Sequence, residues 1–188
     1  MQRDLVERAM AGDHDAFSEL ARVSIGRLYV VARLILRDDK GAEDATQEAL
    51  VAAWRRLDGL RDPDRFEAWL HRLLVNACYR EARRSRRRGS IEIHVEPIAM
   101  PEAPQALDGD FDLADRDQLE RGFRRLDVDQ RTVLVMHYYL GFSLDEAADA
   151  LGVPPGTVRS RLHRAINAMR AALEADARSP ILSEGRSA

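Results

Sequence analysis

Long apolar runs and paired cysteines are both missing from this 188-residue chain. No stretch approaches the ~20 apolar residues that a membrane-spanning helix needs, so we expect no direct membrane insertion. The charged opening, residues 1–8, lacks the apolar core of a signal peptide, which makes a cytoplasmic location the expectation. Because Cys78 is the only cysteine, an intramolecular disulfide and a cysteine-based metal cluster are excluded. We expect Cys78 to lie in a hydrophobic core.

Motifs typical of catalysis and of phosphate or metal binding are also missing. The five histidines are scattered without a metal-binding spacing, and there is no glycine-rich phosphate loop. The conspicuous polar residues are arginines on predicted helices, not the paired groups that acid–base catalysis uses. The sequence therefore predicts a protein that is not an enzyme, has no metal site and needs no cofactor.

An overall basic charge is missing as well, since 29 Lys and Arg face 32 Asp and Glu, for a net charge of −3. A nucleic-acid-binding protein is usually basic, but here the charges are unevenly distributed. Residues 65–88 hold eight Arg and two Glu, residues 89–117 hold eight acids and one Arg, and residues 155–173 hold four Arg and no acid. Two basic segments separated by an acidic one leave two places that could meet phosphate.

Helical periodicity accounts for the first 88 residues. Apolar residues recur at helical spacing over residues 5–36, with a break at residues 12–13, then over residues 42–57, and again from about residue 66. Residues 37–41 are expected to form a turn, and Asp64 with Glu67 has the spacing of a capping box. In the helix over residues 42–57 the expected core positions are Thr46, Leu50, Ala53, Trp54 and Leu57.

The opposite face of the helix over residues 42–57 carries side chains at i, i+3, i+4 and i+7 spacing, which places them on one exposed strip. Solvation alone explains such a strip, so the residues by themselves leave its role open. We call it the polar strip, and it consists of Asp44, Gln47, Glu48, Val51 and Arg55.

The next helix buries apolar residues on one side and presents arginines and an aromatic residue on the other. Such a face suits contact with phosphates and base stacking, and a solvated arginine-rich helix is the alternative. Its members are Arg72, Asn76, Tyr79, Arg80, Arg83 and Arg84, followed by the arginine run at residues 86–88.

Residues 143–170 are the most informative stretch, because they have the pattern of two helices joined by a tight turn. Ser143 and Glu146 have capping-box spacing, Gly152 ends the first helix, and Pro155 suits the first position of the second. This pattern is typical of a DNA-binding helix-turn-helix, whose second helix enters the major groove; a structural hairpin is the alternative. The second helix is expected to expose Arg159, Ser160, Arg161, His163, Arg164 and Asn167.

We predict an all-α fold of two small helical domains. The first covers residues 1–88, and residues 89–112, with three prolines and no sustained apolar period, form a flexible acidic linker. The second domain covers residues 113–175, with helices from 113 to about 126, from 129 to about 140, and then the helix-turn-helix. Residues 176–188 form a polar tail. The core of the second domain is expected to include Val133, Leu134, Met136, His137 and Tyr138.

Four motifs follow one another in a specific order: residues 44–55, Phe66-Glu-Ala-Trp-Leu, Asn76-Ala-Cys-Tyr-Arg80 and Gly156-Thr-Val-Arg-Ser-Arg-Leu-His-Arg164. Each alone is a common helix, but their order and spacing are not. Together they resemble the extracytoplasmic-function (ECF) sigma factors of the sigma-70 superfamily, over residues 15–172. One departure is Pro155, where the family usually has an acidic or small residue, and proline is compatible with that helix start.

The resemblance implies roles that the residues alone leave open. The first domain would be sigma region 2, which binds core RNA polymerase and reads the minus-ten promoter element, and the second would be region 4, which reads the minus-thirty-five element. The loop over residues 58–65 would capture a flipped base. The implied partners are promoter DNA, the polymerase core (the β′ clamp helices and the β subunit) and an anti-sigma factor.

The implied site residues fall into three groups. The polar strip of Asp44, Gln47, Glu48, Val51 and Arg55 would meet polymerase, Asn76, Arg80, Arg83 and Arg84 would meet minus-ten DNA, and Arg159, Ser160, Arg161, His163 and Arg164 would meet minus-thirty-five DNA. The protein would be a non-catalytic specificity subunit of polymerase.

Two other classes of protein fit parts of the sequence. An operator-binding regulator would bind DNA without polymerase, but would normally carry a receiver domain of alternating strands and helices, which the first 88 residues do not show. A helical interaction module would bind neither DNA nor polymerase. Binding assays with each partner separate these hypotheses.

Overall fold

The structure of the chain is a computed structural model that describes residues 2–87 and 113–178. The described residues are helical throughout, apart from short turns, and contain no strand, which confirms the all-α prediction. The predicted linker, residues 89–112, and the end of the predicted tail lie outside the described residues.

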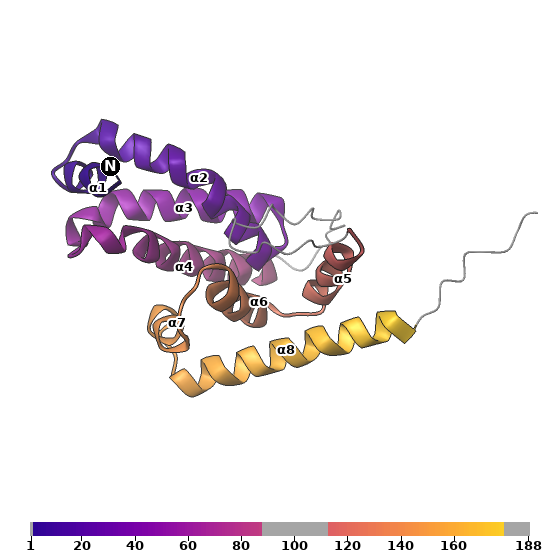
Figure 1. Cartoon of the computed structure of the whole chain (residues 1–188). Helices are drawn as coiled ribbons and strands as arrows, with labels where there is room; N and C mark the ends of the chain where they lie inside the picture. Colours follow the sequence, from indigo (N-terminus) through magenta and orange to yellow (C-terminus); the bar gives the residue numbers. More distant parts are fainter. Residues whose placement is uncertain (1, 88–112, 179–188) are drawn as a thin grey trace, which may run out of the picture.

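The first helical unit consists of α1 (Gln2–Met10), α2 (His14–Leu36), α3 (Asp39–Arg56) and α4 (Phe66–Arg87), with 3-10 turns at Leu57–Gly59 and Pro63–Arg65 between α3 and α4. In Figure 1, α2, α3 and α4 lie side by side and α1 crosses one end of them. Asp13 caps α2 by accepting bonds from the Asp15 and Ala16 amides, which confirms the break expected there.

Two local predictions for this unit are wrong. Residues 37–41 are not a turn, because Asp38 caps α3 by accepting from the Gly41 amide at 2.9 Å, and the helix starts at Asp39. Asp64 and Glu67 form no capping box. Instead Asp62 accepts from the Asp64 amide, and Glu67 accepts a bond from the Gln2 side chain.

The core of the first unit lies where α2, α3 and α4 meet, and Leu28, Ile35 and Leu74 are fully buried there. Cys78 is buried as expected, and burial raises the pKa of its thiol to about 12. The predicted burial of Trp54 is wrong, since 36% of this residue is exposed. α3 buries mainly small residues, Gly41, Ala42, Ala45, Thr46, Ala49 and Ala53, so it packs close to its neighbours and leaves Trp54 at the rim, against the rings of His14 and Phe17.

The second unit consists of α5 (Leu113–Arg124), α6 (Val128–Leu134), α7 (Leu144–Leu151) and α8 (Pro155–Arg178). The helix predicted over residues 129–140 is α6 followed by a π-helical turn over Val135–Tyr139. The wider turn changes which side chains face inward. Met136 is fully buried, whereas Tyr138, predicted in the core, is 63% exposed. α8 continues into the predicted tail as far as Arg178.

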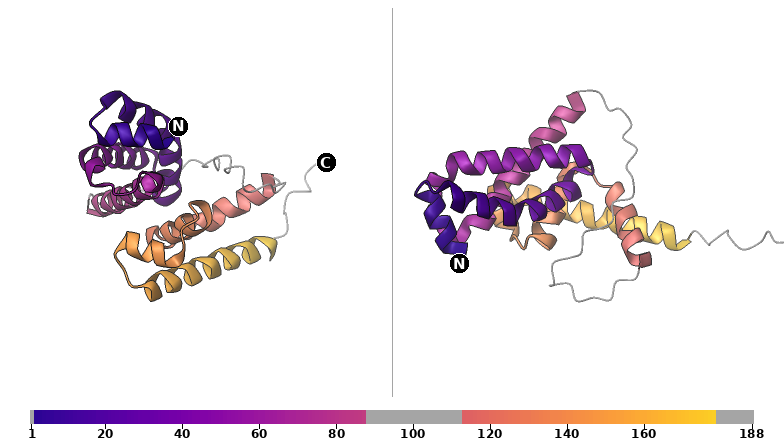
Figure 2. Two further views of the ribbon diagram at one scale, coloured as in Figure 1. Left: turned by 60° about the vertical axis from the view of Figure 1, so that its left-hand side comes forward. Right: turned by 90° about the horizontal axis from the view of Figure 1, so that it is seen from above.

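The two units pack against each other through α2, α4, α6 and α7, and α8 is the outer helix (Figures 1 and 2). Arg131 of α6 is 8% exposed, and its Nε donates to the Ile35 carbonyl at the end of α2 at 2.6 Å. Its Nη1 donates to the Leu126 carbonyl within the second unit. Burial lowers the pKa of Arg131 to about 10, so the guanidinium remains charged at neutral pH.

Candidate nucleic-acid interface

The polar strip lies on the outer face of α3. Asp44, Gln47, Val51 and Arg55 are all exposed, as the spacing predicts. Val51 is 48% exposed, and Trp54 at the rim adds a second exposed apolar side chain on the same helix. A face that combines hydrogen-bonding groups with exposed apolar and aromatic side chains has the composition of a protein-binding surface.

Glu48 differs from the rest of the polar strip because it is only partly exposed and is bound to α4. Its carboxylate pairs with Arg80 Nε at 2.6 Å and with Arg84 Nη1 at 3.2 Å. Arg84 also pairs with Glu81 at 3.4 Å, and these carboxylates raise its pKa. The strip predicted for polymerase and the face predicted for minus-ten DNA therefore adjoin at Glu48.

The α4 face carries Asn76, Arg80, Arg83 and Arg84, all exposed. Within the part of the chain that the structure describes, no carboxylate lies at ion-pair distance from Arg83. Exposed ion pairs such as those of Arg80 and Arg84 with Glu48 contribute little stability, so these two guanidinium groups can exchange a carboxylate for a phosphate at small cost.

Local hydrogen bonds build the helix-turn-helix as the sequence predicts. Ser143 and Glu146 form a complete capping box, and Gly152 ends α7 at a φ of 63°. α8 begins at Pro155, and Val158, Leu162 and Ala165 are buried against α6 and α7. The exposed residues on its other side include Arg159, Ser160, His163 and Arg164.

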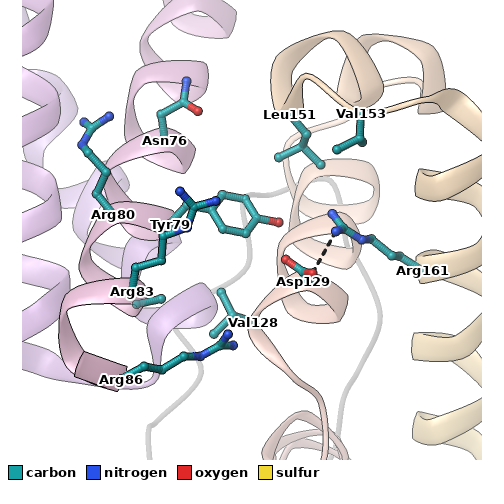
Figure 3. Close-up of a pocket in the computed structure, with 11 residues that line it drawn as sticks. Asn76, Tyr79, Arg80, Arg83, Arg86, Val128, Asp129, Leu151, Val153 and Arg161 are labelled. Atoms are coloured by element: carbon teal, nitrogen blue, oxygen red, sulfur yellow. Dashed lines mark ion pairs between the residues drawn. The ribbon is translucent and has the colours of Figure 1, made fainter. Parts of the chain in front are cut away.

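Arg161 is not on that open face, which corrects the expectation that it is exposed. Only 20% of its side chain is exposed, and its Nη2 pairs with Asp129 of α6 at 2.9 Å. It lines a cavity of about 390 Å³ between the two units. Figure 3 shows Arg161 on one side of this cavity and Asn76, Arg80 and Arg83 on the other.

The structure thus brings three of the predicted minus-ten residues into one cavity with one predicted minus-thirty-five residue. Tyr79, expected on the exposed α4 face, points into the same space toward Asp129 (Figure 3). Burial raises the pKa of Tyr79 to about 12. Arg84, Arg159, Ser160, His163 and Arg164 do not line this cavity.

The described residues hold no three His, Cys, Asp or Glu side chains placed to bind a metal ion together. Over the same residues, no helix has the length and apolar character needed to cross a membrane.

Comparison with known proteins decides the family. Residues 20–88 match sigma-70 region 2, and residues 116–169 match sigma-70, region 4. The ECF RNA polymerase sigma factor SigM of Mycobacterium tuberculosis is 35% identical over 169 residues, covering 86% of this chain and 79% of SigM. The chain is an ECF sigma factor. The RNA polymerase sigma-H factor of Pseudomonas aeruginosa is 30% identical, over 97% of this chain and 96% of its own length.

Solved structures similar to this sigma factor have the same fold. CnrH, solved in complex with the cytosolic domain of CnrY, has a TM-score of 0.62 and 28% identity, over 93% of this chain and 98% of CnrH. RpoE of Bartonella quintana, solved with the anti-sigma factor NepR, has a TM-score of 0.63 and 28% identity, over 85% of this chain and 98% of RpoE. The matches support the hypothesis of an alternative sigma factor that directs transcription. They do not support the alternative hypothesis, an operator-binding regulator, any better.

Three residues at the contact between the two units of this sigma factor were missed by the sequence reasoning: Arg37, Glu120 and Arg131. Only Arg131 carried a signal, because it precedes Leu134 and Val135 by three and four residues and so shares their buried helix face. Nothing in the sequence near Arg37 or Glu120 indicates that the two pair across the contact.

The turn of the helix-turn-helix offers a test with a matched control. Gly152→Ala should lower the free energy of unfolding by about 1 kcal/mol, because alanine is strained at a φ of 63° although space is open around it. Gly156→Ala, also in open space but in the first turn of α8, should raise it by about 0.5 kcal/mol. Urea unfolding of both variants measures the two changes, and the same sign for both would contradict this account of the turn.

Proposed function

We propose that this sigma factor binds core RNA polymerase through the polar strip of α3 and places two DNA-reading faces on the promoter. The observation that carries the proposal is the pairing of this strip with two arginine-bearing helix faces on one chain. The strip would contact the clamp helices of the β′ subunit, and the β subunit is the second proposed partner within the core. The sigma factor itself would catalyse no reaction, because its contribution is to choose the start site for polymerase.

The α4 face would read the minus-ten element. Asn76, Arg80, Arg83 and Arg84 are exposed groups that can contact the backbone and edges of single-stranded DNA. Bases released from the duplex would be held by such contacts, with the arginines also able to contact base faces through their cationic groups. The loop over residues 58–65 is mostly exposed, adjoins the start of α4 and is the proposed place for a flipped base.

The α8 face would read the minus-thirty-five element from the major groove. Arg159, Ser160, His163 and Arg164 are exposed on α8, and Arg161 would join them once it leaves Asp129. The proposed units are region 2 over residues 1–88 and region 4 over residues 113–175, joined by a linker over residues 89–112 that permits the promoter spacing.

An anti-sigma factor is the proposed regulatory partner. CnrH and RpoE, which share the fold, were solved with the cytosolic domain of CnrY and with the anti-sigma factor NepR. The sigma factor would act in the cytoplasm. A comparable partner would hold it inactive until that partner is removed.

Run-off transcription with purified core polymerase tests the proposed function directly. We expect specific transcripts only when core and this sigma factor are both present, from promoters that the reconstituted holoenzyme selects. Absence of sigma-dependent initiation would refute the proposal. A sequence-specific gel shift by the chain without polymerase would instead favour an operator-binding regulator.

The polymerase interface can be tested apart from the DNA-binding face. Asp44→Ala with Gln47→Ala should weaken binding to core polymerase at least about fivefold, because both side chains are exposed on the polar strip. Glu48 is left intact because it also pairs with Arg80 and Arg84. Titration of labelled sigma factor with core measures the change.

The matched control is Ser18→Ala with Glu19→Ala. This pair also removes one carboxylate and one polar side chain from an exposed helix face, but on α2. Equal affinity of the two double variants for core would place the polymerase interface elsewhere.

A further inference from the structure

The cavity between the two units carries an excess of positive charge. Its volume is about 390 Å³, with α4 on one side and residues of α6, α7 and α8 on the other (Figure 3). Among the described residues that line it, Asp129 is the only acid, whereas four are arginines: Arg80, Arg83, Arg86 and Arg161. A space that has guanidinium groups on both sides favours an anion.

Two of these four arginines have carboxylate partners and two do not. Arg80 and Arg161 each form an ion pair. Within the part of the chain that the structure describes, no carboxylate lies at ion-pair distance from Arg83 or Arg86. The α4 side of the cavity therefore has two positive charges that the described residues leave without a partner.

Further positive charge lies close to Arg86. Burial lowers the pKa of Arg131 to about 10, and the charges of Arg37 and Arg86 act in the same direction. Cations that lie near one another repel, and an anion bound between the units would offset this repulsion. Several guanidinium groups around one space suit an anion with several negative charges. Phosphate groups have such charge, and guanidinium binds their oxygens through two parallel hydrogen bonds.

The rest of the lining is mainly apolar. Val128 of α6, Leu151 of α7 and Val153 in the turn before α8 lie on the side opposite α4, and Tyr79 adds an aromatic ring from α4 (Figure 3). Aliphatic and aromatic walls suit the flat base of a nucleotide, which inorganic phosphate lacks. Small-molecule sites have volumes of about 300–1,000 Å³, and this cavity of about 390 Å³ is large enough for such a ligand.

We propose that this cavity binds a phosphate-bearing small molecule of the nucleotide class. Its phosphates lie between the α4 arginines and Arg161 of α8, and its base lies against the apolar side chains. Such a ligand is no part of the proposed function, which assigns arginines of the same two helices to DNA. Because the ligand contacts both units, arginines of both α4 and α8 are needed to bind it.

Isothermal titration calorimetry of the full chain with ATP, at physiological ionic strength and without magnesium, measures binding directly. We expect saturable binding of ATP and weaker binding of inorganic triphosphate, because only ATP has a base to place against the apolar walls. Adenosine, which has no phosphate, should not bind. Absence of saturable binding by both ATP and GTP at millimolar concentration would overturn the proposal. Equal affinity for ATP and triphosphate would overturn the assignment to the nucleotide class.

Variants in each unit test whether both sides of the cavity hold the ligand. Arg83→Ala with Arg86→Ala on α4 should weaken ATP binding at least about tenfold, because charge-assisted hydrogen bonds to phosphate are lost. Arg161→Ala on α8 should weaken it at least about fivefold for the same reason. Circular dichroism checks that the variants keep their helices. Weaker binding in the α4 variant alone would overturn a site between the two units.

Matched controls remove the same charges outside the cavity. Arg56→Ala with Arg87→Ala replaces two exposed arginines of the first unit, and Arg170→Ala replaces one on α8. Salt screens such distant charges, so each control should change ATP affinity less than about twofold. Losses as large as those of the cavity variants would overturn the proposal, because ATP would then bind through general surface charge. ATP binding without run-off transcription would uphold this site and refute the proposed function, and the reverse result would do the opposite.

Discussion

Arg161→Ala is expected to reduce initiation about fivefold or more at promoters that depend on the upstream element. An arginine that binds guanine through two hydrogen bonds discriminates by ~1–3 kcal/mol, and each 1.4 kcal/mol is a factor of ten. Arg161 lies on α8, the helix that would enter the major groove, and it would reach the bases once it leaves Asp129. Run-off transcription with matched templates, with and without the upstream element, measures the effect.

Two further variants separate base reading from other roles of Arg161. Arg170→Ala removes an exposed arginine further along α8 and should leave the upstream element's contribution nearly intact. Asp129→Asn breaks the 2.9 Å ion pair but keeps Arg161, so initiation should be maintained or increased. An equal loss for Arg161→Ala on templates that lack the upstream element would contradict the assignment, because a base contact there would then have nothing to read.

Acidification from pH 7.5 to 5 is expected to lower the free energy of unfolding by about 2 kcal/mol through His71 alone. His71 of α4 is 7% exposed, and burial lowers its pKa from 6.5 to about 4, with Arg27 acting in the same direction and Glu67 against it. The unfolded chain therefore takes up a proton near pH 6.5, while the folded chain resists protonation until about pH 4. This contribution to stability is fully present above pH 6.5 and is lost as the pH falls.

Urea unfolding at several pH values tests this linkage, and His71→Gln is the control because glutamine does not titrate. The variant should show a much flatter stability profile between pH 6.5 and 5. The carboxylates that cap helices contribute to stability down to a lower pH range. Backbone hydrogen bonds lower the pKa values of Asp13 and Glu146 below 3.8 and 4.5, so their contribution declines only in more acidic solution. Parallel profiles for parent and variant would show that His71 is not the group responsible.

Features of this sigma factor that depend on a few neighbouring residues were predictable from the sequence. The capping box of Ser143 and Glu146, the left-handed Gly152 and the helix start at Pro155 all formed as expected, because each needs only hydrogen bonds or backbone angles within one turn. The exposed polar strip on α3 followed from helical spacing alone. Its binding role, like the DNA-reading roles of α4 and α8, remains a prediction.

Features that depend on which helix faces meet were decided by the tertiary structure. Trp54 lies at a rim because α3 packs through its small residues, and Tyr138 turns outward because a π-helical turn changes the register of the helix. Arg161 has the spacing of an exposed reader, yet it pairs with Asp129 against the other unit. Helical periodicity specifies which face of a helix is buried but not which helix packs against it. The sequence by itself therefore determined the helices and their caps. Long-range packing decided that Arg161 is paired and only partly exposed.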